Sequence, residues 1–345
     1  MILDLYAGAG GWDEGARTLG LRNIIGFDNW WDACATAKAA GHLRIQADVS
    51  TYPTAPFAGK VKGKIGSPPC TPFSRAGKQL GLLDQARVHA LVNRMAAGDD
   101  HWQDMPWQDD RSHHAAQPVR WVRDIRPEWV ALEQVPEVLP LWRHISDVFR
   151  GWGYSVWTGV LNAADYGVPQ TRERAILIAS RVRAVHQPET THEENPPTDA
   201  LFGARQPWVT IGEALGWHGV DRPARTVSGN RAPRWAYDQA NSYGTGWTLT
   251  HGPQPNAAVR TIDQPAATVV CSRPGNLRWT DGDGHRQVGH REAAILQSFR
   301  PDYPWHGNKT SRFHQISNAV PPGLAAAVIA QAAGLPATAP TLAAA

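Results

Sequence analysis

Apolar runs and amphipathic segments alternate along the first half of the chain. Short, continuous apolar runs predict buried β-strands, and longer segments with apolar residues every three or four positions predict helices. These patterns predict strands at residues 1–6, 23–28, 61–65, 129–132, 155–161 and 175–179, and helices at 12–19, 32–40 and 141–150. Such an alternation predicts an α/β fold with a doubly wound, mostly parallel sheet.

The pattern weakens in two places. Residues 75–111 are polar and poorly patterned, which predicts a mobile lid. Beyond Arg183, proline, glycine, tryptophan and arginine become frequent, residues 192–197 resemble a linker, and no further strand–helix alternation is visible. A helix is predicted again at 323–332, and the low-complexity tail at 336–345 is predicted to be disordered.

Composition narrows the protein class. The chain has 345 residues, enough for one large domain and a smaller one. Its three cysteines, Cys34, Cys70 and Cys271, are odd in number and far apart, which argues against a disulfide framework and for a reducing compartment. No apolar run reaches the roughly 18 residues of a membrane span, and the first residues lack a basic leader. We therefore expect a soluble, cytoplasmic protein without a membrane partner.

The net charge of +3 is mild, but the placement of the basic residues is informative. Arginines alternate with aromatic residues through the C-terminal half, at Arg222, Arg225, Arg231, Arg234, Arg260, Arg273, Arg278 and Arg286 and at Trp208, Trp217, Trp235, Tyr237, Tyr243, Trp247 and Trp279. Guanidinium groups contact phosphates and aromatic rings stack on bases, so this mixture suits nucleic-acid binding. An ordinary tryptophan-rich surface is the alternative.

The stretch most suggestive of chemistry is residues 66–74, Gly-Ser-Pro-Pro-Cys-Thr-Pro-Phe-Ser, directly after a predicted strand. Pro68 and Pro69 fix φ and lack an N–H, so the chain leaves the sheet there in one stiff direction. Open α/β folds place their chemistry at this edge of the sheet, which positions Cys70 as a nucleophile. A buried structural cysteine is the alternative.

A glycine-rich turn follows the first predicted strand, in the stretch from Leu3 to Gly11. Glycines let a ligand approach the backbone, and the following helix N-terminus favours negative groups. The spacing Gly-Ala-Gly-Gly does not match the dinucleotide fingerprint. Asp28 and Asp48 follow the next two strands, where carboxylates could bind a nucleoside; helix capping is the alternative for each.

Together these features resemble the C5-cytosine DNA methyltransferases over nearly the whole chain, from Leu3 to about Ala332. Five segments match or approximate motifs of that family and occur in its order: residues 4–11, Pro69-Cys70, Glu133-Gln134-Val135, Gln170-Thr171-Arg172-Glu173-Arg174 and Ser317-Asn318-Ala319-Val320-Pro321. Each match alone could arise by chance, but five in register identify the chain as a member of this family.

The resemblance implies a Rossmann-like methyltransferase fold and transfer of a methyl group to C5 of a flipped cytosine in double-stranded DNA. Cys70 would add to C6 of the ring through its sulfur. Glu133 would hold or protonate N3, and Arg172 and Arg174 would approach O2. The residues implied to contact the substrate nucleotide are Ser67, Pro69, Ser74 and Gln170.

The methyl donor implied by the resemblance is S-adenosylmethionine, and no metal is implied. Tyr6 would pack against its adenine, Asp28 would accept the ribose hydroxyls and Asp48 the adenine amine. The full set of implied cofactor contacts is Asp4, Tyr6, Ala7, Gly8, Gly10, Gly11, Asp28, Asn29, Trp30, Asp48, Val49, Pro68, Asn318 and Val320.

Four positions depart from the family pattern. Tyr6 replaces phenylalanine, so its hydroxyl needs a partner, and Ser317 replaces glycine. Both lie near the donor in family terms, which raises the hypothesis of a changed donor preference. Thr71 replaces glutamine after the cysteine, and Gln134 replaces asparagine after the glutamate, which lengthens a supporting side chain.

The resemblance also implies a domain organisation. It assigns a catalytic and cofactor-binding domain to residues 1–183, an irregular target-recognition domain to 184–290, a segment returning to the catalytic domain to 291–335, and a disordered tail to 336–345. Two similar segments, 221–229 and 263–270, compete for the position of the family's ninth motif.

The implied partners are double-stranded DNA and a cognate restriction endonuclease, and a monomer is expected. Three alternatives remain. Ser67-Pro68-Pro69 also fits amino-methyltransferases, which would leave Glu133 and the two arginines unexplained. An RNA-directed relative would share the motifs but have a smaller recognition region. A non-catalytic DNA-binding remnant would have no need to retain all four catalytic residues.

Overall fold

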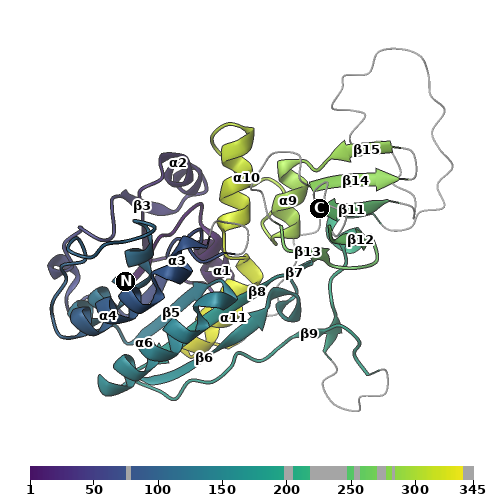
Figure 1. Cartoon of the computed structure of the whole chain (residues 1–345). Helices are drawn as coiled ribbons and strands as arrows, with labels where there is room; N and C mark the ends of the chain where they lie inside the picture. Colours follow the sequence, from purple (N-terminus) through teal and green to yellow (C-terminus); the bar gives the residue numbers. More distant parts are fainter. Residues whose placement is uncertain are drawn as a thin grey trace.

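A computed structural model describes residues 1–74, 79–197, 205–217, 247–251, 257–269, 277–281 and 284–336. Its larger lobe is built on a seven-stranded sheet in the order β3-β2-β1-β4-β5-β8-β6 (Figure 1). The strands are β1 (Ile2–Leu5), β2 (Ile24–Asp28), β3 (Leu43–Gln46), β4 (Gly63–Gly66), β5 (Trp129–Gln134), β6 (Ser155–Asn162) and β8 (Glu173–Ser180). The first five neighbours in this order are parallel, and β8 runs antiparallel to both β5 and β6. The predicted α/β fold with a mostly parallel sheet is confirmed.

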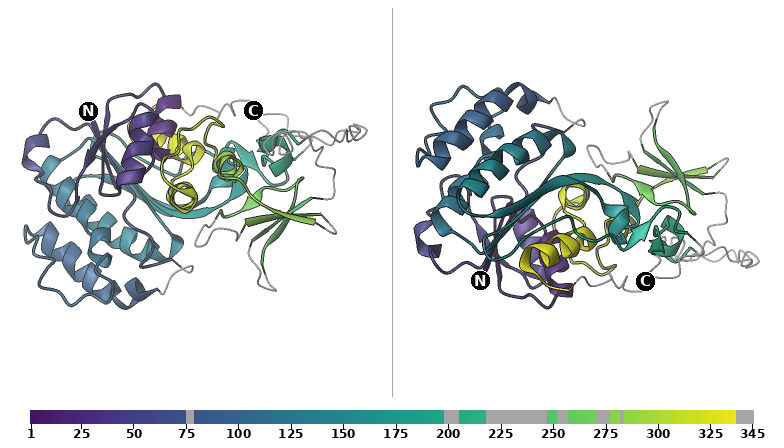
Figure 2. Two further views of the ribbon diagram at one scale, coloured as in Figure 1. Left: turned by 90° about the horizontal axis from the view of Figure 1, so that it is seen from above. Right: turned by 90° about the horizontal axis from the view of Figure 1, so that it is seen from below.

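Helices cover both faces of this sheet (Figure 2). They are α1 (Gly11–Thr18), α2 (Trp31–Ala39), α3 (Leu80–Leu83), α4 (Gln85–Ala96), α5 (Gln117–Ile125), α6 (Leu139–Gly151) and α11 (Pro322–Ala333). Strand β5 is buried along its whole length and sends alternate side chains to opposite faces. Val130 and Leu132 join the core beneath α4 and α6, whereas Trp129 and Ala131 join the core beneath α1 and α11. Burial on both faces explains why the first four residues of this strand, 129–132, form a continuous apolar run.

The expectation of a mobile, poorly patterned segment at 75–111 was wrong for residues 80–96, where the chain forms α3 and α4. Residues 75–78 lie outside the described part, but α4 is a regular helix with Val88, Leu91, Val92 and Met95 buried on one side. This spacing of three and four residues is the helical one, and polar residues between the apolar positions hid it. The segment therefore packs into the core beneath β5.

The smaller lobe contains a four-stranded antiparallel sheet in the order β12-β11-β14-β15. Its elements are β11 (Thr248–His251), β12 (Val259–Thr261), β14 (Leu277–Asp281), β15 (Gly284–Gln287), α7 (Ile211–Leu215), α9 (His290–Leu296) and α10 (Lys309–Asn318). Its core includes Leu249, Trp279 and Tyr303, and also Ala9 from the glycine-rich turn of the larger lobe. The two lobes therefore share a core beside that turn.

The predicted linker contributes β9 (His192–Glu193), which pairs with β10 (Gln206–Pro207).

One of the two similar segments lies against the Gln-x-Arg-x-Arg motif. β13 (Ala266–Ala267) pairs in parallel with β7 (Gln170–Thr171), and Thr268 Oγ1 donates a hydrogen bond to the carbonyl of Thr171 over 2.9 Å. The other segment, 221–229, lies outside the described residues, as do Cys271 and the arginines at 222, 225, 231, 234 and 273. The domain boundaries themselves stay a prediction.

One stretch of the described chain, Lys309–Ala333, is long and apolar enough to cross a membrane by length and composition alone. It consists of α10 and α11 with a break between them, and 67% of its most apolar window is buried inside the protein. Leu324, Val328 and Ile329 are fully buried in the core under the sheet. Its apolar character is thus that of a core helix.

The contact between α1 and α11 depends on a small residue and yields a stability prediction. A Cβ on Gly15 would lie 2.7 Å from both Ala325 Cβ and the Pro322 carbonyl oxygen. We expect Gly15→Ala to lose about 1–3 kcal/mol of stability through overpacking. Gly151→Ala is the control, because a Cβ there meets nothing within 4 Å. Its stability should change by no more than about 0.5 kcal/mol. Chemical unfolding of both variants measures the difference, and equal midpoints would contradict this account of the contact.

Candidate active site

A cavity opens at the carboxyl ends of β1, β2, β4 and β5, with about 970 Å³ of empty space including solvent at its mouth. Ligand sites of open α/β sheets lie at this edge. The predicted site residues that line it are Tyr6, Ala7, Gly8, Gly11, Asp28, Asn29, Trp30, Ser67, Pro68, Pro69, Cys70, Glu133, Arg172, Arg174, Asn318 and Val320. Residues from six separate parts of the sequence thus meet at one cavity, which contains both the cysteine and the glycine-rich turn.

The turn that carries Cys70 is held by the end of β5. Gln134 Nε2 donates hydrogen bonds to the carbonyl oxygens of Pro68 and Pro69 over 2.9 and 3.2 Å. Its Oε1 accepts a 2.7 Å hydrogen bond from the Val135 amide, and the side chain is almost fully buried. Prolines cannot donate hydrogen bonds themselves, so their carbonyls are the groups by which a neighbouring strand can fix this turn. Gln134 is the side chain that does so.

Glu133 and Arg174 form the ion pair of the site. Arg174 Nε lies 2.9 Å from Glu133 Oε1, and both side chains are about nine-tenths buried. The pair results from antiparallel pairing of β5 with β8, which sets Glu133 opposite Ile176 and brings the start of β8 to the cavity. A buried carboxylate held by a guanidinium beside the cysteine can orient a polar ring within hydrogen-bonding distance.

The thiol of Cys70 is in a mixed electrostatic environment. Burial raises the pKa of Cys70, and the carboxylate of Glu133 raises it further, whereas the guanidinium groups of Arg174 and Arg172 oppose the shift. The net direction is upward. The thiol form therefore dominates at neutral pH, and the two arginines limit the upward shift of the Cys70 pKa.

Arg172 is placed differently from Arg174. The residue is 2% exposed, and its Nη2 donates to the carbonyl oxygens of Ser317 and Ala319 over 2.9 and 3.3 Å. Arg172 lines the cavity, but these contacts tie the start of β8 to the segment that carries Asn318. Arg174 instead pairs with Glu133, and both line the cavity together with Cys70.

The glycine-rich turn and the end of β2 form the other wall. The Gly8 amide donates to Asp28 Oδ2 and the Trp30 amide donates to Asp28 Oδ1, each over 2.8 Å. Burial raises the pKa of Asp28, although these hydrogen bonds oppose the shift. Each carboxylate oxygen keeps lone-pair capacity for a further donor, such as a ribose hydroxyl. A Cβ on Gly8 would meet nothing within 4 Å, so open space lies beside the turn. These features fit a nucleoside cofactor.

The hydroxyl of Tyr6 has found a partner. Tyr6 Oη lies 3.1 Å from His114 Nδ1, and the two rings meet edge to face with centroids 5.4 Å apart. Burial raises the pKa of Tyr6 well above its usual value, so the hydroxyl stays protonated. The ring is thus anchored at the cavity wall. Ser317, the other departure near the donor, donates from Oγ to the His314 carbonyl over 3.2 Å.

Six predicted site residues do not line the cavity: Asp4, Gly10, Asp48, Val49, Ser74 and Gln170. Asp48 is exposed; partial burial raises its pKa, but hydrogen bonds from Ser50 and the nearby His114 and His113 together make the net shift of the Asp48 pKa downward. Gln170 is fully buried, donates to Gln297 Oε1 over 2.8 Å and accepts from the Val269 amide over 3.0 Å. The assigned ligand contacts of these residues stay predictions.

Sequence reasoning missed several lining residues. Trp12 Nε1 donates to Ser67 Oγ over 2.9 Å, which links the first helix to the turn before the cysteine. Gln315 reaches the cavity from α10, and its Oε1 accepts a 2.6 Å hydrogen bond from Thr36. Trp12 fell in a predicted helix and Gln315 in no predicted element, because no local pattern distinguishes a lining side chain from any other amphipathic position.

The fold and this cavity define an S-adenosylmethionine-dependent methyltransferase. The family model for C-5 cytosine-specific DNA methylases matches residues 1–94 and 106–333, and the chain belongs to that family. Its relatives include the Type II methyltransferase M1.HphI of Haemophilus parahaemolyticus, 28% identical over 94% of this chain and 84% of that protein. Another is M.NgoMIV of Neisseria gonorrhoeae, 27% identical over 94% and 95% of the two chains.

Solved structures share the fold. The S. pombe Dnmt2 methyltransferase superposes with a TM-score of 0.57 at 16% identity, over 96% of this chain and 98% of that one. The Entamoeba histolytica methyltransferase EhMeth gives 0.56 at 11% identity, over 96% and 97% of the two chains. The predicted family, enzyme class and cofactor are therefore confirmed.

The hydrogen bonds of Gln134 lead to a kinetic prediction. Gln134→Met keeps the apolar volume but removes the donors to Pro68 and Pro69, so the cysteine turn loses its support. We expect methyl-transfer kcat to fall about 10- to 100-fold, since misplacing a reacting group by 1 Å costs about that much. The KM for S-adenosylmethionine should change little. Gln134→Asn, which retains an amide, should keep more activity; equal losses in both variants would rule out a role for the hydrogen bonds.

The environment of Cys70 leads to a pH prediction. Because its pKa is raised, the thiolate is populated only as the pH rises beyond the ordinary cysteine range of about 8–9. The alkylation rate of Cys70 by iodoacetamide, followed by peptide mass spectrometry, should rise through an inflection above that range. Arg174→Gln removes an opposing cation and should move the inflection to still higher pH. An inflection below the range would contradict this account.

Proposed function

We propose that this enzyme methylates C5 of a cytosine in double-stranded DNA through a covalent bond between Cys70 and C6, after the base has left the helix. The observation that carries the proposal is the single cavity shared by Cys70, Glu133 and Arg174 with the wall formed by Gly8 and Asp28. Because they line one cavity, Cys70 and Glu133 can contact the cytosine ring while the wall at Gly8 and Asp28 holds the methyl donor beside it.

The first step is addition of sulfur to the ring. The Cys70 thiolate donates an electron pair to C6, the C5–C6 double bond opens, and its electrons move through the ring toward N3 and C5. Glu133, in its protonated form, would transfer its proton to N3 and become the carboxylate that Arg174 holds, and the protonated N3 makes C6 more electrophilic. Arg174 would hold Glu133 in place and face the O2 side, where negative charge develops. The nearby guanidinium of Arg172 would favour the thiolate before it attacks.

The second step uses the nucleophilic C5 that the addition creates. When bound, S-adenosylmethionine supplies an electrophilic methyl group to this carbon. Loss of the C5 proton to a base then restores the double bond and expels Cys70 as a thiolate. The cavity wall at Gly8, Asp28 and Tyr6 would orient the donor, and Asn318 and Val320 would complete the lining.

A cytosine in a duplex presents C6 inside the stack, so the base must be extruded. Ser67, Pro69 and Ser74, together with Gln170, are proposed to bind the extruded nucleotide, although only the first two line the cavity. Residues 184–290 would recognise the target sequence. Among the described arginines there, Arg260 and Arg278 belong to the four-stranded sheet and could contact phosphate or base edges.

The biological setting is part of the same proposal. The Type II methyltransferase relatives support modification within a restriction system, with a cognate endonuclease acting on the same site. A monomer would suffice, because each strand can be methylated in a separate event. A DNA-modifying enzyme of this kind would act in the cytoplasm.

The test uses duplex DNA containing 5-fluorocytosine, with S-adenosylmethionine, followed by denaturing electrophoresis. Fluorine at C5 cannot leave as a proton does, so the enzyme should remain bonded to the DNA. Cys70→Ala should abolish the adduct. Cys34→Ala is the matched control, because this second cysteine is 1% exposed and belongs to α2. It should form the adduct as the unmodified enzyme does.

Three results would overturn the proposal. An adduct that survives Cys70→Ala would show another nucleophile. Methylation of unmodified DNA by Cys70→Ala would exclude covalent catalysis by this residue. An adduct with RNA but with none of a random set of DNA duplexes would reassign the substrate.

A further inference from the structure

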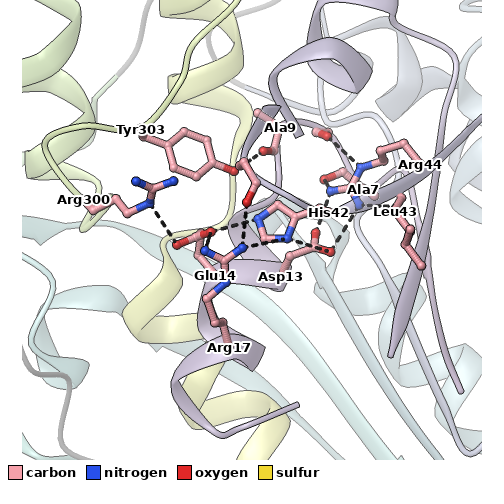
Figure 3. A network of polar contacts seen from close by, with 12 residues as sticks. Ala7, Ala9, Asp13, Glu14, Arg17, His42, Leu43, Arg44, Arg300 and Tyr303 are labelled. Atoms are coloured by element: carbon pink, nitrogen blue, oxygen red, sulfur yellow. Dashed lines mark hydrogen bonds and ion pairs between the residues drawn. The ribbon is translucent and has the colours of Figure 1, made fainter. Parts of the chain in front are cut away.

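We propose that Arg44 and Tyr303 are positioning residues for S-adenosylmethionine, because they fix the backbone carbonyls of the glycine-rich turn on the side away from the cofactor. Figure 3 shows the two side chains approaching this turn from different parts of the chain. The inference rests on the cofactor site described above. It assigns a task to two residues that do not line the cavity.

Arg44 comes from β3 and its side chain is fully buried. Its Nε donates to the Gly8 carbonyl over 3.3 Å, and Nη2 donates to the Ala7 carbonyl over 3.4 Å. Both Nη atoms also bind the carboxylate of Asp13 in the first turn of α1, over 3.2 and 2.6 Å. One guanidinium thus joins the turn to the helix that follows it, and the paired carboxylate keeps the buried cation compensated.

Tyr303 comes from the segment between α9 and α10. Its Oη donates to the Ala9 carbonyl over 2.5 Å, and its ring packs against Phe299 and Trp305 in the core of the smaller lobe. A Cβ on Gly10 would lie 2.6 Å from this hydroxyl, so the approach requires glycine there. Arg44 and Tyr303 together hold three consecutive carbonyls.

The turn needs such support because of its conformation. Tyr6, Gly8 and Gly10 all have positive φ values, 61°, 53° and 111°. Left-handed backbone is costly for tyrosine, and glycine loses the most freedom when it is ordered. A turn that was not held in advance would have to be ordered by the cofactor, at the expense of affinity. With the turn fixed, the Gly8 amide already points at Asp28.

A second group of contacts holds the side chain of Glu14, the residue after Asp13. His42 Nε2 lies 2.8 Å from Glu14 Oε1, and Arg17 Nη1 lies 3.2 Å from the same oxygen (Figure 3). Arg300 Nε lies 3.8 Å from the other oxygen of Glu14 and extends from the same segment as Tyr303. These contacts connect the start of α1 to His42, just before β3, and to Arg300 in the smaller lobe.

The test is Tyr303→Phe, which removes one hydroxyl and keeps the ring in its core. We expect the Kd for S-adenosylhomocysteine, measured by titration calorimetry on the full chain, to rise about fivefold to tenfold, as for loss of one buried hydrogen bond. The KM for S-adenosylmethionine should rise in parallel, while kcat at saturating cofactor stays within about twofold, since the turn does not contact the reacting carbon.

Tyr154→Phe is the matched control. Tyr154 is as buried as Tyr303, at 3% against 4% exposed, and its hydroxyl also donates to a backbone carbonyl, that of Pro127, over 2.7 Å. It should lose comparable thermal stability but retain the original Kd. Arg44→Lys keeps a cation but cannot serve Asp13 and two carbonyls together, and should weaken binding at least as much as Tyr303→Phe.

An unchanged Kd in Tyr303→Phe would overturn the inference, and so would an equal rise in Tyr154→Phe, because the effect would then be general destabilisation. A failure of this inference can be distinguished from a failure of the proposed covalent mechanism. Tyr303→Phe should still form the 5-fluorocytosine adduct at saturating S-adenosylmethionine, whereas Cys70→Ala should bind S-adenosylhomocysteine normally and form none.

Discussion

The antiparallel pairing of β5 with β8 is the constraint on which the part of the cavity around Cys70 and Glu133 depends. This pairing sets Gln134 opposite Ala175. Arg174, the residue before Ala175 in β8, then lies with its Nε 2.9 Å from Glu133 Oε1. Successive residues of a strand point to opposite sides, so Glu133 serves the ion pair while Gln134 turns toward the Pro-Pro-Cys segment. A shift of one residue in this register would exchange the two side chains and dismantle both sets of contacts.

Close backbone approach is the second requirement, and it joins the two ends of the chain. A Cβ on Gly11 would lie 2.1 Å from the Val320 carbonyl oxygen, and Gly15 lets α11 pack against α1. Ala9 belongs to the core of the smaller lobe. The wall of the cofactor cavity is therefore made from the first strand and the last helices together, so neither end of the chain forms it alone.

Buried charge beneath the glycine-rich turn is the third element. Asp4 is fully buried on β1, and neither of its carboxylate oxygens has a hydrogen-bond partner within the described residues. Burial raises the pKa of Asp4 and lowers the pKa of Lys64, on the adjacent strand, to about 7. Arg44 and Asp13 complete this cluster. Asp4 thus belongs to a buried cluster of ionisable groups, and its assigned contact with the cofactor stays a prediction.

The sequence by itself determined the alternation of strands and helices and the family. It also singled out Cys70, Glu133 and the two arginines as the candidate catalytic residues. These are properties of local pattern, since periodic burial and short motifs are written in consecutive residues. Only the tertiary structure decided which side chains meet. Gln134 binds Pro68 across 66 positions and Tyr303 binds Ala9 across 294, so each pair depends on strand order, register and the packing of two lobes. For the same reason α4 was not predicted: polar residues stand between its apolar positions, and only packing against the core shows that those positions form one buried face.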